Sequence, residues 1–198
     1  GYCDNIQLMV GSRDHYDCWT ELIPSADFVD YYRNADGSEF KWSAYLTGWD
    51  DLTPAQREVF FLRNNLTSNQ SAYNDAKSRI GAEVMNKYYL DSGNEARIKK
   101  AYESRDPRLQ QTIITPYSST NCYSPYWNSG EPMQNKVLRW PYLNRGGNNG
   151  DMWHNQRNAG YYIYKKYNET EKGRYIERLR CHCDYPLIRF TDVWLLFA

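Results

Sequence analysis

The segment NEARIKKAYESRDPRLQQTIITPY, residues 94–117, contains the change of period that decides the fold. Its first part has apolar residues at helical spacing along one face. After Asp106-Pro107, the stretch 109–117 is rich in β-branched residues, which favours a short strand. The sequence therefore predicts a helix that is followed, across a tight turn, by a strand.

Helical signals also precede this segment. Thr53, Pro54 and Gln56 form a capping box, in which the Thr and Gln side chains satisfy the first backbone N–H groups of a helix. Residues 75–90 have apolar positions at helical spacing, and a short helix is expected within 24–40. We therefore expect the first half of the chain to be mainly helical.

The second half begins with a long segment of little periodicity, residues 118–159, which is rich in Asn, Gly, Ser, Pro, Tyr and Trp. Disordered segments are poor in aromatic residues, and ordered loops of this length are usually functional. The segment is therefore expected to be an ordered functional loop. Residues 160–167 alternate as a strand does, and 184–198 has the pattern of a helix that is apolar nearly all round. A helix of this kind indicates that the chain is part of a longer protein, and that the residues packing against the helix lie outside this sequence.

Charge and composition argue against several classes of protein. Lys plus Arg and Asp plus Glu both number 24, and no basic cluster appears, so nucleic acid is not expected as a partner. No apolar run reaches the length of a membrane span. The 19 Tyr, 7 Trp and 6 Phe make up 16% of the chain and replace aliphatic residues. Because Tyr and Trp suit surfaces that both stack and hydrogen-bond, this composition favours a binding protein.

Neither a metal nor another cofactor is predicted. The chain has five cysteines, and Cys181-His182-Cys183 invites a zinc interpretation. Structural zinc sites use a two-residue gap and four ligands, however, and no second pair is present at such spacing.

Catalysis is the alternative to binding. The three histidines are scattered and no hydrolase motif appears, but Asp50-Asp51 or Glu131 with Asp151 could form the carboxylate pair of a glycoside hydrolase. Adjacent acids lie more often on a solvated turn, and that mechanism requires a particular separation of its carboxylates. A glycoside hydrolase domain therefore stays as the second interpretation.

Carbohydrate binding needs flat aromatic rings for the C–H face of a sugar and polar side chains for its hydroxyl groups. Several aromatic residues of this chain lie in polar, glycine-containing stretches rather than on apolar faces. The predicted stacking platforms are Trp49, Tyr126, Trp127 and Trp153, and the predicted hydrogen-bonding residues are Asp50, Asn128 and Asn155.

Four motifs in a fixed order give a resemblance to a known family. PSADFVDYYRNADG at 24–37, YESRDPRLQQTII at 102–114, GYYIYKKY at 160–167 and DYPLIRFTDVWLLFA at 184–198 resemble the SusD/RagB family of outer-membrane nutrient-binding lipoproteins. The Cys-His-Cys insert is not part of that pattern.

The resemblance implies a mainly α fold of the tetratricopeptide type, with long irregular loops and one small β element. Residues 1–198 would form a single region: a helical and loop part at 24–106, strands plus the variable ligand loop at 107–183, and the start of a helical-repeat helix at 184–198.

The resemblance also implies a function. Such a protein would bind an oligosaccharide, a polysaccharide or another nutrient at the cell surface without catalysis. It would deliver the nutrient to a SusC-like TonB-dependent porin in the outer membrane. Its only attachment to the membrane would be a lipid anchor that lies outside this sequence. A purely structural role, in docking to the porin, is a third interpretation.

Overall fold

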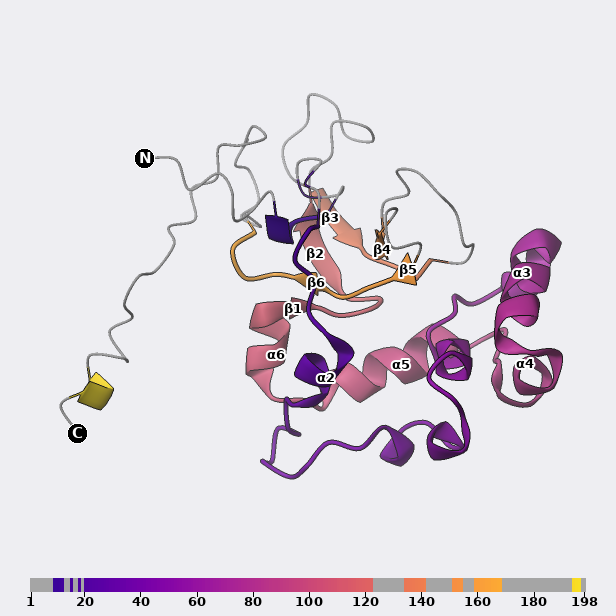
Figure 1. Cartoon of the computed structure of the whole chain (residues 1–198), viewed down its shortest axis with the longest axis horizontal. Coiled ribbons are helices and arrows are strands. Elements are labelled where there is room, and N and C mark those ends of the chain that lie inside the picture. Colours follow the sequence, from indigo (N-terminus) through magenta and orange to yellow (C-terminus); the bar gives the residue numbers. More distant parts are fainter. Residues whose placement is uncertain are drawn as a thin grey trace.

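The helix and strand predicted around residue 106 lie at the centre of the computed structural model (Figure 1). Helix α5, Asn94–Glu103, runs beneath the β-strands and ends at Ser104, after which Arg105 begins the turn. A second helix, α6 (Pro107–Thr112), follows at once, and the strand β1 is only Ile113–Ile114. The predicted strand over 109–117 is therefore wrong for residues 109–112. Asp106 caps α6 by accepting a hydrogen bond from Arg108 N at 2.9 Å, and Pro107 occupies its first turn.

The structure describes residues 9–12, 15, 18, 20–122, 134–141, 151–154, 159–168 and 194–196. The remaining α-helices are α2 (Ala26–Asp30), α3 (Gln70–Ile80) and α4 (Ala82–Tyr88). The 3₁₀ helices are η1 (Trp42–Ala44), η2 (Trp49–Asp51), η3 (Gln56–Phe60) and η4 (Leu66–Ser68). Within these residues the fold is mainly helical with small two-stranded sheets, as the sequence predicts. Of the predicted helix 184–198, the described turn 194–196 is helical and exposed.

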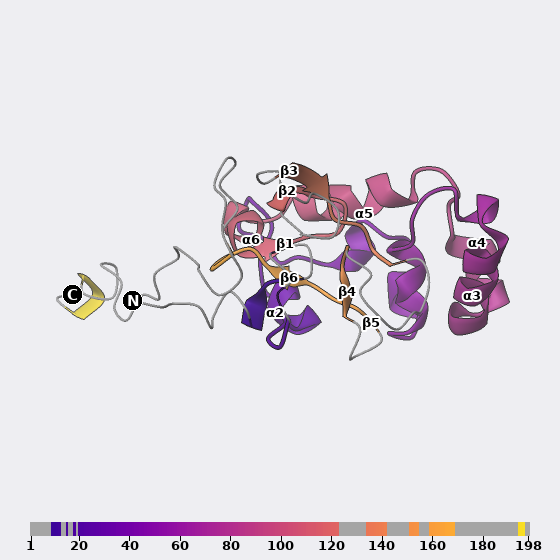
Figure 2. The same cartoon turned by 90° about the horizontal axis from the view of Figure 1, so that it is seen from above.

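Two helices replace the single helix expected over 75–90. Helices α3 and α4 lie side by side at one end of the structure in both views (Figures 1 and 2). Gly81 separates them with a φ of +104°, a conformation that residues with a side chain rarely adopt. The Asn69 side chain begins α3 by accepting a hydrogen bond from Ala72 N at 3.1 Å.

The capping box at Thr53 is present, but it precedes a 3₁₀ helix. Thr53 N donates to Gln56 Oε1 at 3.0 Å, and Gln56 N donates to Thr53 Oγ1 at 3.4 Å. The carbonyls of Val59, Phe60 and Leu62 accept hydrogen bonds from the buried amide of Asn94. This contact across 32 to 35 residues fixes the end of η3 and ties it to the start of α5, where sequence spacing alone predicts a longer helix.

Three antiparallel pairs make up the described sheets. Strand β1 pairs with β6 (Ile163–Tyr164), so the two segments predicted as strands do meet, although each strand is shorter than expected. Strand β2 (Ser119–Cys122) pairs with β3 (Gln134–Val137), and β4 (Trp153–His154) pairs with β5 (Ala159–Gly160). Except for Gly160, the last two pairs lie in 118–159, for which the sequence predicts an ordered loop of little periodicity.

Aromatic rings form much of the core. Trp42 stacks on Trp49 with ring centroids 4.8 Å apart and an angle of 23° between the planes, and its edge meets Tyr102 at 5.4 Å. Phe61 joins this group to Trp140, 4.9 Å away. Such pairs add about 1 kcal/mol each beyond the area that they bury. Among the described residues, many of the aromatic side chains are thus used inside the molecule.

Arg105, which is only 2% exposed, ties α2 to the turn before α6. Its Nε donates to Tyr32 O at 2.9 Å and its Nη2 to Val29 O at 2.5 Å, so that it caps the carboxyl end of α2. The guanidinium lies 3.5 Å from the centroid of the Phe40 ring. The cation is therefore buried with partners on several sides.

Replacing Arg105 by Met should lower the free energy of unfolding by about 3 kcal/mol, because the buried Val29 carbonyl and the partly buried Tyr32 carbonyl lose their donor. Chemical denaturation of the two proteins measures this difference. Arg108→Met is the matched control, since the Arg108 side chain is 79% exposed and its loss should cost about 0.5 kcal/mol or less. Equal decreases of the unfolding free energy in the two variants would show that Arg105 does not hold α2 to the turn before α6.

His15 is a buried link between the N-terminal residues and β2. Its Nδ1 lies 2.9 Å from Ser12 Oγ, and its Nε2 lies 3.7 Å from Cys122 Sγ. Burial, with a smaller contribution from the charge of Lys136, lowers the pKa of His15 from 6.5 to about 4. The folded protein therefore holds His15 neutral at a pH where the unfolded chain would protonate it.

This pKa shift predicts a pH dependence of stability. The contribution of neutral His15 is fully present above pH 6.5 and is lost as the pH falls toward 4, and the total loss is about 3 kcal/mol. Chemical denaturation of the native protein and of His15→Gln at several pH values measures it. The difference between their unfolding free energies should shrink across that interval, whereas a constant difference would contradict the assignment.

Candidate functional site

Trp49, one of the predicted stacking platforms, lies at the edge of the aromatic core. Gly48 precedes it with a φ of +86° and packs so closely on the Tyr88 ring that a Cβ would lie 2.3 Å from it. Besides Trp42, the Trp49 ring contacts the Arg57 guanidinium, 4.9 Å from its centroid. Trp49 is therefore half-buried and held in place, while Asp50 beside it on η2 is exposed.

The other predicted site residues are only partly visible. Tyr126, Trp127, Asn128 and Asn155 lie outside the described residues. The backbone of Trp153 lies in β4, paired with Gly160, and its side chain is not described. Of the predicted set, the structure thus places only Trp49 and Asp50 together in full.

A continuous series of contacts joins Trp49 to the base of the predicted ligand loop. Phe61 lies 6.3 Å from Trp49 and 4.9 Å from Trp140 between ring centroids. The Trp140 ring packs directly on Gly160, where a Cβ would lie 2.6 Å from it. Because Gly160 pairs with Trp153, η2 and the β4–β5 pair belong to one packed unit.

Asp151, a candidate for the hydrolase pair, has a structural contact. Its Oδ2 lies 2.6 Å from Arg63 Nη2, and its Oδ1 accepts a hydrogen bond from Arg139 N at 3.3 Å. Arg63 also donates from Nε to Trp140 O at 2.6 Å. The carboxylate of Asp151 therefore helps to fix the base of the loop. Asp50 and Asp51 are both exposed on η2, and Glu131 lies outside the described residues.

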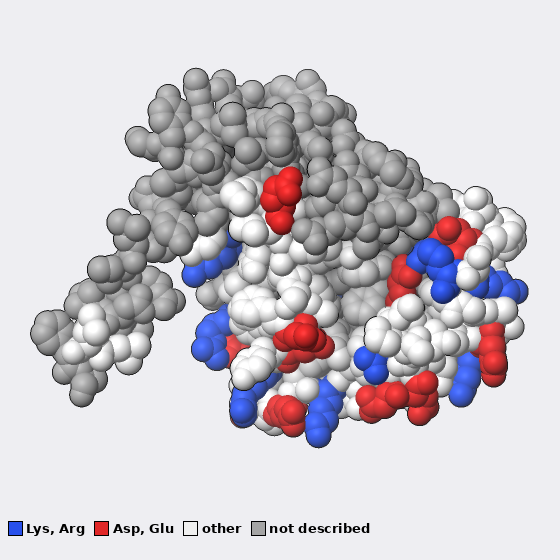
Figure 3. Space-filling model, viewed as in Figure 1, with Lys and Arg blue, Asp and Glu red and all other residues white. Residues whose placement is uncertain are grey.

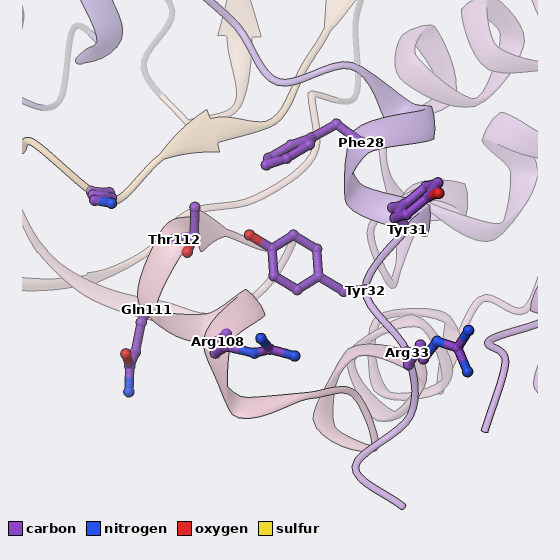
Figure 4. Close-up of a pocket in the computed structure, with 8 residues that line it drawn as sticks. Phe28, Tyr31, Tyr32, Arg33, Arg108, Gln111 and Thr112 are labelled. Carbon is purple, nitrogen blue, oxygen red and sulfur yellow. The ribbon is translucent and has the colours of Figure 1, made fainter. Parts of the chain in front are cut away.

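A pocket of about 850 Å³ lies between α2 and α6, at a place that the sequence interpretation missed (Figure 4). One side is aromatic and the other is polar and basic. The residues that line it are Phe28, Tyr31, Tyr32, Arg33, Arg108, Gln111, Thr112 and Lys166.

Helix α2 presents its aromatic residues to this pocket because of how it is anchored. Ser25 caps the helix by accepting a hydrogen bond from Phe28 N at 3.1 Å. Val29 is fully buried in the core, whereas Phe28 and Tyr31 are 42% and 89% exposed. Phe28 meets the edge of Tyr32 with ring centroids 5.6 Å apart. In Figure 4, Phe28 and Tyr32 project toward α6, and the Tyr32 hydroxyl lies on the side of Thr112.

Helix α6 and the residues after β6 supply the polar side. The carboxylate of Asp106 receives hydrogen bonds from Arg108 Nε and Nη2, and these bonds lower the pKa of Asp106 to about 2. Arg33 Nη1 donates to Gly37 O at 3.0 Å. The backbone N–H groups of Lys165 and Lys166 donate to Thr112 O, at 2.8 and 3.3 Å. The polar rim is therefore attached to the helix that forms the pocket wall.

A signal for this pocket is present in the sequence. Phe28, Tyr31 and Tyr32 follow at i, i+3 and i+4, a spacing that predicts three aromatic rings on one side of a helix, although α2 itself ends at Asp30. Their use as a wall depends on α6 and on Lys166, which are about 80 and 140 residues away along the chain. Local pattern alone does not bring these residues together.

The described residues also show how surface charge is distributed, whether a helix could span a membrane and whether a metal-binding group is present. In Figure 3, acidic and basic side chains are interspersed over the described part of that face. No helix in the described part of the chain has the length and apolar character to cross a membrane. Among the same residues, no three His, Cys, Asp or Glu side chains are grouped so as to hold a metal ion. Cys181-His182-Cys183 lies outside them.

Comparison with known proteins identifies the family. The model of the SusD family matches residues 3–198, while no curated protein and no solved structure matches the chain. Proteins of this family generally bind glycans or other nutrients without catalysis and work with SusC-like transporters at the outer-membrane surface. Since the match covers all but the first two residues, the chain belongs to the SusD family.

Proposed function

We propose that this protein captures a glycan at the bacterial cell surface and passes it, chemically unchanged, to a SusC-like TonB-dependent transporter. A lipid anchor would hold the protein at the outer membrane. Family membership supports this role in general terms, and the pocket between α2 and α6 supports sugar as the ligand class.

The observation that carries the proposal is the exposed aromatic wall of the pocket. Tyr31, which lines the pocket as Phe28 does, is 89% exposed and has no core position to explain its ring. A sugar could place its C–H face against such rings, while the side chains of Gln111 and Thr112 offer donors and acceptors to its hydroxyl groups. A volume of about 850 Å³ lies within the range of small-ligand pockets, about 300–1,000 Å³.

A second contact surface is proposed at the variable loop. Trp49 and Asp50, with Tyr126, Trp127, Asn128, Trp153 and Asn155, would bind a further part of a long glycan. The packing of Trp49 through Phe61 and Trp140 to the base of the loop supports this extension. Trp49 itself would offer only the part of its ring that the core leaves uncovered.

Replacing Tyr31 by Ala should weaken glycan binding about tenfold, because one stacked aromatic contributes about 1.4 kcal/mol. Tyr31→Phe keeps the ring and is the matched control, with a loss of about twofold or less. Affinity electrophoresis against a panel of polysaccharides, followed by calorimetry with the best ligand, measures both. Since Tyr31 is exposed, the variants should keep the native melting temperature. Undiminished binding by Tyr31→Ala would exclude the pocket as the site.

The loop surface has its own test. Trp127→Ala together with Trp153→Ala should reduce retention on polysaccharide gels without unfolding the protein, and more strongly for long chains than for short oligosaccharides. Retention equal to that of the native protein for every chain length would remove the loop from the proposal. Release of shorter sugars during incubation would instead support a glycoside hydrolase.

A further inference from the structure

We propose that the pocket between α2 and α6 selects a sugar that carries a carboxylate or sulfate group. This inference rests on the proposed function and adds the chemical class of the ligand. The main evidence for this selectivity is the positive charge of the pocket rim.

The charge of the pocket rim differs from the net charge of the whole chain. The whole sequence has a net charge of zero, yet three of the eight lining residues, Arg33, Arg108 and Lys166, are cationic. None of the described residues that line the pocket is acidic. Asp106 pairs with Arg108 and neutralises one of these charges, which leaves Arg33 and Lys166 as the excess. An anionic group bound near them would complete the charge balance of the pocket.

The two excess cations keep donors for a ligand. Arg33 uses one Nη1 hydrogen bond to Gly37 O, and a guanidinium has five N–H donors. The Lys166 ammonium lies 5.2 Å from the centroid of the Tyr167 ring, and an ammonium has three donors. Carboxylate and sulfate oxygens accept such charge-assisted hydrogen bonds at short distance.

The cations are also held on a fixed framework. Arg33 directly follows Tyr32, whose carbonyl is bound by buried Arg105, and Asp106 N donates to Arg33 O at 2.9 Å. Lys166 is attached to α6 through its backbone bond to Thr112 O. Arg33, Arg108 and Lys166 therefore come from three separate segments of the chain, and their positive charges lie at one pocket before a ligand binds. This pre-organisation reduces the entropy that binding would otherwise cost.

The rest of the wall favours a sugar over a simple inorganic anion. Phe28, Tyr31 and Tyr32 present aromatic surface that a small ion would leave uncovered. Gln111 and Thr112 add neutral hydrogen-bonding groups, which match hydroxyls rather than charges. A ring with hydroxyl groups and one anionic substituent uses all three kinds of surface.

The direct test compares one oligosaccharide in two charge states. Calorimetry of the full chain with an oligogalacturonate, and with the same oligosaccharide methyl-esterified, changes the charge while keeping the sugar ring. A sulfated chondroitin oligosaccharide and its desulfated form make the second arm, which distinguishes sulfate from carboxylate. We expect the charged form of at least one pair to bind about tenfold more tightly at low salt, and the preference to shrink in high salt.

Variants assign the effect to the pocket. R33Q with K166Q should bring the affinities of the charged and neutral forms to within about twofold of each other. K87Q with K100Q is the matched control, because it removes the same charge from α4 and α5 away from the pocket and should keep the full preference. Loss of the preference in both double variants would attribute it to overall charge and overturn the proposal.

The outcomes separate this inference from the proposed function. Equal binding of both members of each pair would overturn the selectivity while leaving sugar capture in place. Failure of every glycan, charged or neutral, to bind would overturn both. Tighter binding of a mononucleotide than of any sugar acid would show that the pocket serves another anionic ligand, which also overturns the inference.

Discussion

The burial of Arg105 is the constraint on which the rest of the described structure depends. Burying a cation is costly unless it has hydrogen-bond partners. Arg105 is 2% exposed, and its Nε and Nη2 donate to the carbonyls of Tyr32 and Val29, while its Nη1 is buried without a hydrogen-bond partner among the described residues. Asp30 lies nearby, with burial raising its pKa and the Trp42 and Arg105 interactions lowering it. The same side chain therefore fixes the end of α2, the turn before α6 and, through both helices, the shape of the pocket.

Much of the helical structure follows from local signals. The spacing of apolar residues in α5, the Asp106-Pro107 cap and the capping box at Thr53 all act over a few residues, so the sequence reveals them. The end of η3 is instead held by Asn94, 32 to 35 residues away along the chain. The pocket needs contacts across an even longer separation. Sequence pattern predicts neither, because neither is a property of a local segment.

The aromatic residues divide into two groups with different physical roles. Trp42, Phe61 and the half-buried Trp49 pack against one another and make the core that aliphatic residues make in other proteins. Tyr31 makes no such contribution, because its ring is in solvent. Composition alone favoured a binding protein, but only the structure separates the rings that stabilise the fold from those that a ligand can reach.

The central claim is that a sugar binds between α2 and α6. It is tested most directly by NMR titration of the isotopically labelled chain with the oligosaccharide of highest affinity. We expect the largest chemical-shift changes at the backbone amides of Tyr31, Tyr32, Gln111 and Thr112, with α3 and α4 unaffected. Saturating changes confined to other parts of the chain would contradict the account.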